Sequence, residues 1–132
     1  MEISSYRDLK AWQLSMDVVE HVYQLTQGFP KQETYNLTSQ IQRAAVSIPS
    51  NVAEGHTRDS TKEFLHHLSI ALGSLSELET QLILSQRLRY INEQELNAIL
   101  LKTEETGKIL RGLQRSLKAK LHQRDRDSGA SG

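Results

Sequence analysis

A glutamate and a histidine three positions apart, Glu63 and His66, are the residues best suited to chemistry in this sequence. In di-iron helical bundles a Glu-x-x-His pair supplies half of a metal site, and a second such pair with two further inward glutamates completes it. None of the other four histidines forms a second pair. Glu63 also has a structural role without a metal, because Ser60 followed three residues later by a carboxylate forms a helix-capping box. We therefore predict no metal site and no bound cofactor.

Small and polar residues gather around Pro49 and form a second candidate site. A proline inside a helix removes one backbone hydrogen bond, and nearby polar side chains can satisfy the freed groups. We interpret this cluster as support for a kink and as a contact with a second subunit; the alternative is a site for a ligand or another partner. Its members are Arg43, Ser47, Pro49, Ser50, Asn51 and Glu54. No Ser-His-Asp arrangement and no glycine-rich phosphate loop can be recognised, so no catalytic residue is predicted.

Basic residues form a third candidate site near the end of the chain. Lys108, Arg111, Arg115 and Lys118 are spaced by three, four and three, so they share one helix face. Between Thr106 and Arg124 there is no acidic residue. We favour a solvated helix end whose cations complement the helix dipole. The alternative is a stripe that contacts nucleic-acid phosphates.

Four helices are predicted to position these residues, near 6–27, 35–55, 61–87 and 93–121. Capping signals at Ser5, Ser60 and Asn92 precede three of them. In the first helix the seam is predicted at Leu9, Trp12, Met16, Val19, Tyr23 and Thr26, widened by Val18, Val22 and Leu25. The extra width fits either a thick core stripe or contact with a second subunit. Short links between the helices favour an all-α fold, an antiparallel up-down four-helix bundle.

The second helix is predicted to be kinked, because its apolar period continues past Pro49. Gly55 is predicted to end it as a C′ residue. The third helix has a glycine at its centre, Gly73, and we expect close packing against the small residues of the second helix to compensate for it. The fourth helix is the longest, so its end is predicted to project beyond the bundle.

The overall composition indicates a single soluble domain of 132 residues. Sixteen basic residues balance sixteen acidic ones, so global charge gives no support for nucleic-acid binding. There is no cysteine, and no apolar run long enough to span a membrane. We expect a cytoplasmic protein with a bundle domain over 1–121 and a disordered polar tail over 122–132.

The sequence resembles the four-helix-bundle proteins first met as reading frames in intervening sequences of bacterial large-subunit ribosomal RNA genes. The resemblance rests on YRDLKAWQLSMDVV at 6–19, TSQIQRAAVSIPSNVAEG at 38–55 and EFLHHLSIALGSLSELETQLILSQRLRYI at 63–91. The second stretch is the most specific, and the match covers about residues 5–118.

This resemblance implies a bacterial protein that assembles as a homopentamer, and no family catalytic residue can be carried over. A related fold, the accessory variability protein of diversity-generating retroelements, is a basic pentamer that works with a reverse transcriptase and nucleic acid. Zero net charge sets the present chain apart from that relative. We therefore predict a non-enzymatic homo-oligomer, a scaffold or accessory factor with an RNA or nucleoprotein partner. The alternative is a protein–protein interaction module that binds no nucleic acid.

Overall fold

The computed structural model describes residues 5–130, with side chains to residue 127, and consists mainly of helices. Two short 3-10 helices, η1 (Tyr6–Asp8) and η2 (Lys31–Glu33), accompany the α-helices α1 (Lys10–Thr26), α2 (Leu37–Thr57), α3 (Thr61–Arg87) and α4 (Glu93–Ala130). None of the described residues lies in a strand, which confirms the predicted all-α class. Within this part of the chain, no helix has the length and apolar content needed to cross a membrane.

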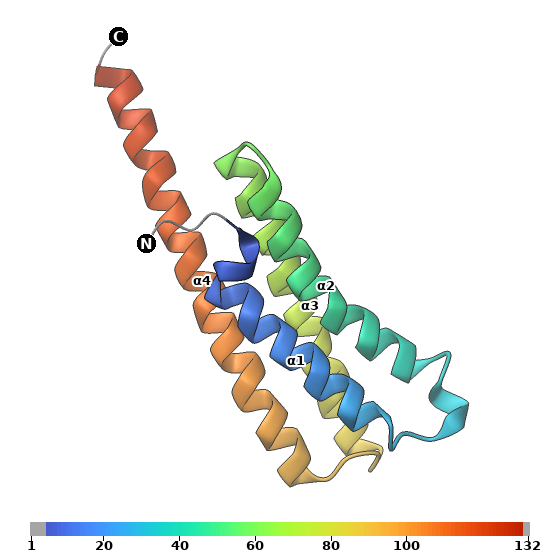
Figure 1. Ribbon diagram of the computed structural model, residues 1–132. Coiled ribbons are helices and arrows are strands. Elements are labelled where there is room, and N and C mark those ends of the chain that lie inside the picture. The colour runs from blue at the N-terminus through green and yellow to red at the C-terminus, as the bar shows by residue number, and fades with distance from the viewer. Residues whose placement is uncertain (1–4, 131–132) are drawn as a thin grey trace.

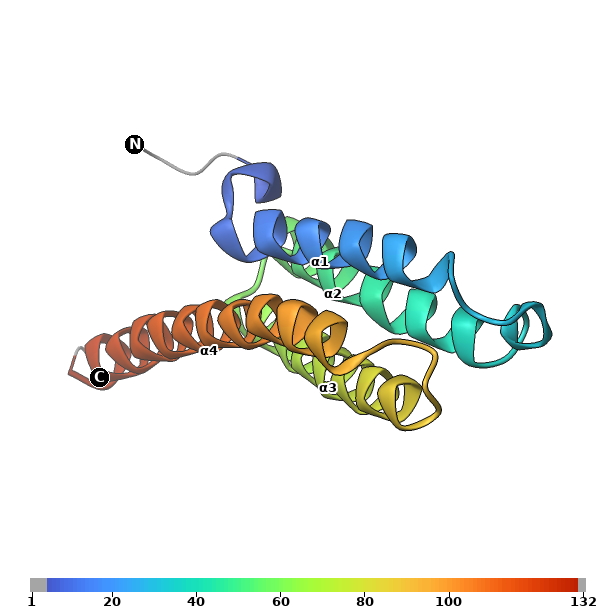
Figure 2. The same ribbon diagram turned by 90° about the horizontal axis from the view of Figure 1, so that it is seen from below.

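Successive helices run in opposite directions and lie side by side, as Figure 1 shows. Each helix contacts the next one along the chain, and α4 also contacts α1. Figure 2 shows α1 and α2 in one layer and α3 and α4 in the other. The four helices therefore enclose one core, in the up-down order that short connections favour.

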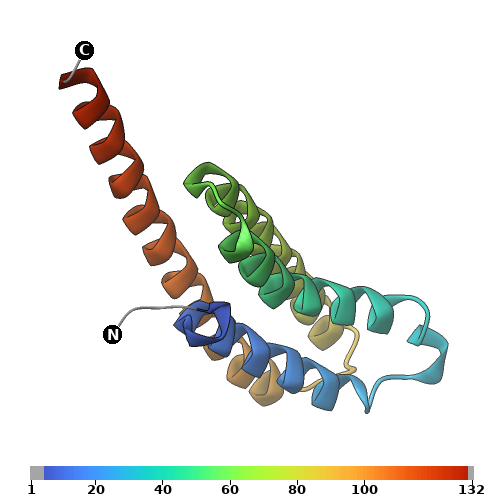
Figure 3. The same cartoon turned by 45° about the horizontal axis from the view of Figure 1, so that its top comes forward.

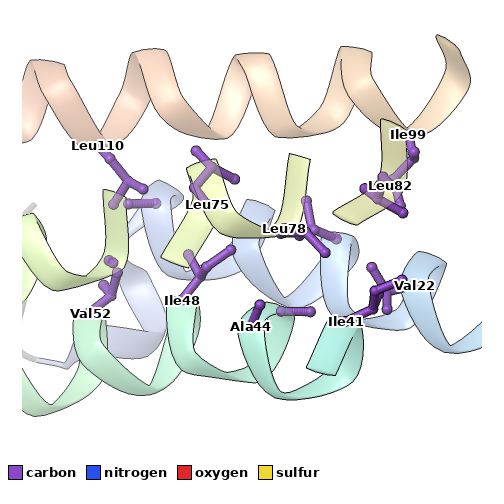
Figure 4. Packing of buried hydrophobic residues seen from close by; sticks show 14 of the residues in the cluster. Val22, Ile41, Ala44, Ile48, Val52, Leu75, Leu78, Leu82, Ile99 and Leu110 are labelled. Carbon is purple, nitrogen blue, oxygen red and sulfur yellow. The ribbon is translucent and has the colours of Figure 1, made fainter. Parts of the chain in front are cut away.

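Aliphatic side chains from all four helices fill that core. Ile41 and Ile48 of α2 and Leu78 and Leu82 of α3 are fully buried, and α4 contributes Leu110. Figure 4 shows these residues pointing toward one another between the helices. Within α2 and α3 the buried residues recur at the spacing of three and four residues from which the helices were predicted.

The face of α1 that enters the core differs from the predicted seam. Ala11, Ser15, Val18 and Val22 are the buried residues in the middle of this helix, whereas Met16 and Tyr23 are exposed. Ser15 fits in the core because its hydroxyl donates a hydrogen bond to the carbonyl of Ala11. Leu9 and Thr26, at the ends of the predicted seam, are buried, and Trp12 and Val19 pack half-buried against the core beside α2. The predicted seam therefore forms one edge of the buried face of α1.

Two α-helices begin at the predicted capping residues, and α1 begins later than predicted. Asn92 and Glu95 exchange hydrogen bonds of 2.9 and 2.7 Å between side chain and backbone, and Ser60 accepts one from the N–H of Glu63 at 3.3 Å. Ser5 caps η1 through the N–H of Arg7, so α1 begins only after the extended residue Leu9. The first predicted helix is thus a 3-10 turn followed by an α-helix.

Pro49 lies inside one continuous α2, and Figure 3 shows this helix changing direction part-way along its length. Gly55 does not end α2 as predicted, because the helix continues to Thr57 and Gly55 has no positive φ angle. A Cβ atom at Gly55 would lie 2.7 Å from Cβ of His67 and 2.9 Å from Cδ1 of Phe64. This glycine therefore permits the close approach of α2 and α3.

Gly73 does not have the role predicted for it. A Cβ atom there would meet nothing within 4 Å, so Gly73 faces open space and does not pack against α2. The reason is its angular position, since Ala71, Leu75 and Leu78 occupy the buried side of α3.

The fourth helix continues to Ala130, beyond its predicted end at Leu121. Residues 122–130, predicted to belong to a disordered tail, extend the helix. This segment contains no proline, and its single glycine, Gly129, lies next to its end, so nothing in it interrupts a helix earlier. Leu117 is the last buried residue of α4, and the segment after it projects beyond the other helices in Figure 1, as predicted.

Candidate interaction surfaces

The polar cluster around Pro49 divides between two sides of α2. Ser47 and Asn51 turn toward α3, where the Ser47 Oγ lies 2.8 Å from Oγ of Ser74 and the Asn51 Oδ1 lies 3.0 Å from Nδ1 of His67. The Asn51 amide also donates to the carbonyl of Ser47 at 2.9 Å. These two residues therefore join α2 to α3, and Ser47 also lines a surface hollow together with Arg43.

The remaining members of the cluster face outward or toward α1. Arg43 and Ser50 are exposed, and Glu54 forms an ion pair with Arg58 at 2.8 Å on the surface of α2. Pro49 is buried beside α1. The six predicted residues therefore do not form one pocket.

An apolar groove between α1 and α2 lies beside Pro49. Trp12, Met16 and Val19 line it from α1, and Val46 and Ala53 line it from α2. A second hollow continues past Val46 to Tyr23, Ser39, Gln42 and Arg43. The sequence signal for this groove was the outer apolar stripe of α1, which had been predicted as the bundle seam.

A smaller apolar surface lies near the end of α3. Ile83 is 39% exposed, Leu84 is 44% exposed and Leu88, just after the helix, is 46% exposed. Ile83 and Leu84 line a shallow hollow with Thr80 and Arg87. Sequence reasoning missed this surface because these leucine and isoleucine residues lie outside the α3 seam.

The four predicted stripe residues, Lys108, Arg111, Arg115 and Lys118, are all exposed on α4. Because α4 continues past Leu121, His122 and Arg126 extend the same helical spacing. The Arg111 and Arg115 guanidiniums lie beside Gly107 and Gly112, at 3.0 and 3.7 Å from the positions that a Cβ would take. Among the residues whose side chains are described, the ion pair between Glu54 and Arg58 is the only one. The cations of the stripe are therefore open to solvent.

Glu63 and His66, the metal candidates rejected above, are both exposed at the start of α3. Between residues 5 and 127 no group of three or more histidine, aspartate or glutamate side chains is arranged to hold a metal ion.

A groove between α1 and α4 contains His21, a histidine with a lowered pKa. Burial, with a smaller contribution from the charge of Lys102, lowers the pKa of His21 below its ordinary value of 6.5. Its Nδ1 atom is buried without a hydrogen-bond partner. His21 is therefore held in its neutral form more strongly than a solvated histidine.

A hydrogen bond joins the two loops at one end of the bundle. The Tyr90 hydroxyl donates to Oε2 of Glu33 at 2.9 Å, and the ring of Tyr90 lies 5.4 Å from that of Phe29. The hydrogen bond to Glu33, followed by burial and the Glu33 charge, raises the pKa of Tyr90. This contact positions the connection before α4 and offers no reactive group.

Comparison with known proteins identifies the family of the chain and a solved structure that resembles it. The family described as 23S rRNA-intervening sequence protein matches residues 7–112. The chain is similar to a protein of unknown function from the S23 ribosomal protein family of Bacteroides thetaiotaomicron VPI-5482, with 26% identity and a TM-score of 0.73. That similarity covers 79% of this chain and 97% of the relative. No curated protein matches the chain.

Proposed function

We propose, from the premise that the chain belongs to the 23S rRNA-intervening sequence protein family, that it acts by assembling with copies of itself and not by catalysis. In this proposal the assembly is a scaffold or accessory factor for a nucleoprotein complex. The observation that carries the proposal is the apolar groove between α1 and α2. Neither that groove nor the polar cluster beside it arranges a nucleophile with a base.

The groove exposes apolar surface that the bundle leaves uncovered. Met16 is 36% exposed, Val46 is 40% exposed and Tyr23, beside the groove, is 44% exposed. Contiguous apolar surface of this kind marks interaction sites, because covering it removes about 25 cal/mol per Å² of unfavourable hydration. We propose that a second copy of the chain covers it.

The apolar surface of Ile83, Leu84 and Leu88 offers the complementary side of such a contact. It lies at the end of α3, which does not contact α1, so the two apolar surfaces lie on different parts of the bundle. A contact between two different surfaces is heterologous, and heterologous contacts close into rings when the rotation permits. The family resemblance supports five subunits for the proposed ring.

Light scattering after size-exclusion chromatography tests this assembly. We expect a particle of five times the 15.0 kDa chain mass. Val46→Asp places a charge in the groove and should reduce the particle to smaller species. The matched control is Leu101→Asp, which changes a residue 70% exposed on α4, outside the groove. A monomeric wild type, or an unchanged mass for Val46→Asp with retained helicity, would contradict the proposal.

A second candidate function is favoured by the cationic stripe on α4. Lys108, Arg111, Arg115 and Lys118 could contact phosphates, and repetition around a ring would add weak contacts through multivalency. The balanced total charge opposes long-range attraction of RNA and favours the alternative, a protein–protein interaction module. Affinity capture from native cells, with bound RNA and protein both identified, separates these two functions.

A further inference from the structure

The groove between α1 and α4 has a different character from the apolar groove between α1 and α2. It has a volume of about 280 Å³. From α1 it is lined by Leu14, Asp17, Glu20, His21 and Gln24, and from α4 by Lys102, Glu105 and Thr106. Its lining combines apolar and polar surface, so a partner for this groove must bring groups of both kinds.

The charges around this groove are predominantly negative. Asp17, Glu20 and Glu105 supply three carboxylates, while Lys102 supplies one opposing cation. His21 adds no charge near neutral pH because burial lowers its pKa. None of the three carboxylates takes part in the ion pair found among the described side chains. The groove therefore favours a cationic occupant.

The projecting end of α4, residues 118–130, carries such cations and is called the α4 arm below. Lys120 and Arg124 are four residues apart, so they lie on one face, and Leu121 lies beside them at helical spacing. This face continues the stripe of Leu113 and Leu117 past the end of the other helices. The arm thus presents a face with two cations and Leu121, and with Asp127 at its far end, and no helix of its own bundle lies against this face.

We propose that the groove between α1 and α4 receives the α4 arm of a second copy of the chain. Lys120 and Arg124 face the carboxylates of Asp17, Glu20 and Glu105, and Leu121 covers Leu14. The dimensions agree, because residues 118–127 of the arm rise about 14 Å and the groove residues 14–24 of α1 rise about 15 Å.

The arm cannot reach the groove of its own bundle. Thr106 in the groove and Lys120 in the arm belong to one continuous helix, and Lys120 lies fourteen positions after Thr106, a rise of about 21 Å. Only another copy can bring the two surfaces together. The inference therefore rests on the proposed self-assembly, and it adds a polar contact at a place separate from the apolar groove beside Pro49.

Charge exchange in the full-length chain tests the contact. The groove variant is Asp17→Lys with Glu20→Lys, the arm variant is Lys120→Glu with Arg124→Glu, and a third protein combines all four changes. Analytical ultracentrifugation at low salt measures the protein concentration at which half of the chains are assembled, called half-assembly here. Either reversal should raise that concentration about tenfold or more, since opposed like charges weaken association. The combined protein should return to within about threefold of wild type, because its charges are complementary again.

A matched control reverses two cations on another face of α4. Arg111→Glu with Arg115→Glu makes the same change in net charge as the arm variant and should leave half-assembly within about threefold of wild type. An arm variant that assembles like this control, or a combined protein as weak as the single reversals, would overturn the inference. If the arm variant assembles normally while Val46→Asp does not, the proposed function stands and only the arm contact fails. A wild type that stays monomeric would overturn both.

Discussion

Two glycines show how the same residue type has opposite roles at different places in the bundle. Gly55 lies where α2 approaches α3, and an added Cβ would lie 2.7 Å from Cβ of His67. Gly73 faces open space on α3. The sequence suggested a helix end for the first and close packing for the second, since neither position reveals which helix lies opposite.

Replacing these glycines by alanine should change stability in opposite directions. Gly73→Ala should raise the free energy of unfolding by about 0.5–1 kcal/mol, because alanine is the better helix former and meets no neighbour. Gly55→Ala should lower it, because α2 and α3 must separate to admit the new methyl group. Urea denaturation followed by circular dichroism measures both. A destabilising Gly73→Ala would show that another surface covers that face.

His21 should make stability depend on pH. Its folded pKa is lowered from 6.5 by burial and Lys102, so below 6.5 the unfolded chain binds more protons than the folded one. Stability is therefore retained above pH 6.5 and decreases as the pH falls from 6.5 through the folded pKa. Denaturant unfolding of wild type and His21→Gln at pH values on both sides of 6.5 should show a smaller decrease for the variant. An equal decrease in the wild type and in His21→Gln would show that His21 does not carry this pH dependence.

Among the helices, α2 contains the stretch that is most specific to the family, and it also contains a proline in its interior. Pro49 removes a backbone donor, yet α2 continues through it to Thr57. The buried ring lies beside the apolar groove, with Val46 and Ser50 as neighbours in the lining. The course of α2 at this point therefore shapes the surface that we propose for self-assembly.

Pro49→Ala tests that connection. Alanine restores the missing N–H and favours a straighter helix, so helicity measured by circular dichroism should stay the same or increase. The altered course of α2 should change the groove and weaken assembly, measured as particle mass by light scattering during dilution. An unchanged particle with unchanged stability would show that the bundle merely tolerates this proline.

At the scale of the whole molecule, zero net charge hides a strong separation of charge. Carboxylates line the groove between α1 and α4, whereas the second half of α4 from Thr106 to Arg124 contains cations and no acidic residue. Opposite charges in separate regions of one chain favour contacts between copies that repeat around a ring. The cationic stripe of α4 takes no part in the contacts proposed above, so it stays available to an external polyanion.

We expect weak, sequence-independent RNA binding at the stripe of Lys108, Arg111, Arg115 and Lys118. Four phosphate contacts should give a slope of about −3 for log affinity against log salt, since single strands release about 0.7 counterion per contact. Fluorescence anisotropy with a generic RNA at two salt concentrations measures this slope. Reversing all four charges should abolish binding. Affinity that survives the reversal, or that does not change with salt, would exclude the stripe as the site.

The sequence by itself determined the helices and most of their buried faces, because a period of three and four residues is a local property of the chain. Ile41, Ile48, Leu78 and Leu110 could be assigned to the core in this way. The capping pair of Asn92 and Glu95 is equally local, since both partners lie within one helical turn.

Only the tertiary structure decided which of two overlapping stripes of α1 faces the core. Both stripes satisfy the same period, and the choice depends on how α1 meets α2 and α4. The hydrogen bonds of Ser47 and Asn51 to α3 have the same origin, because they depend on which side of α2 faces α3. Both grooves were likewise beyond the reach of the sequence, since each is formed where residues distant in the chain meet.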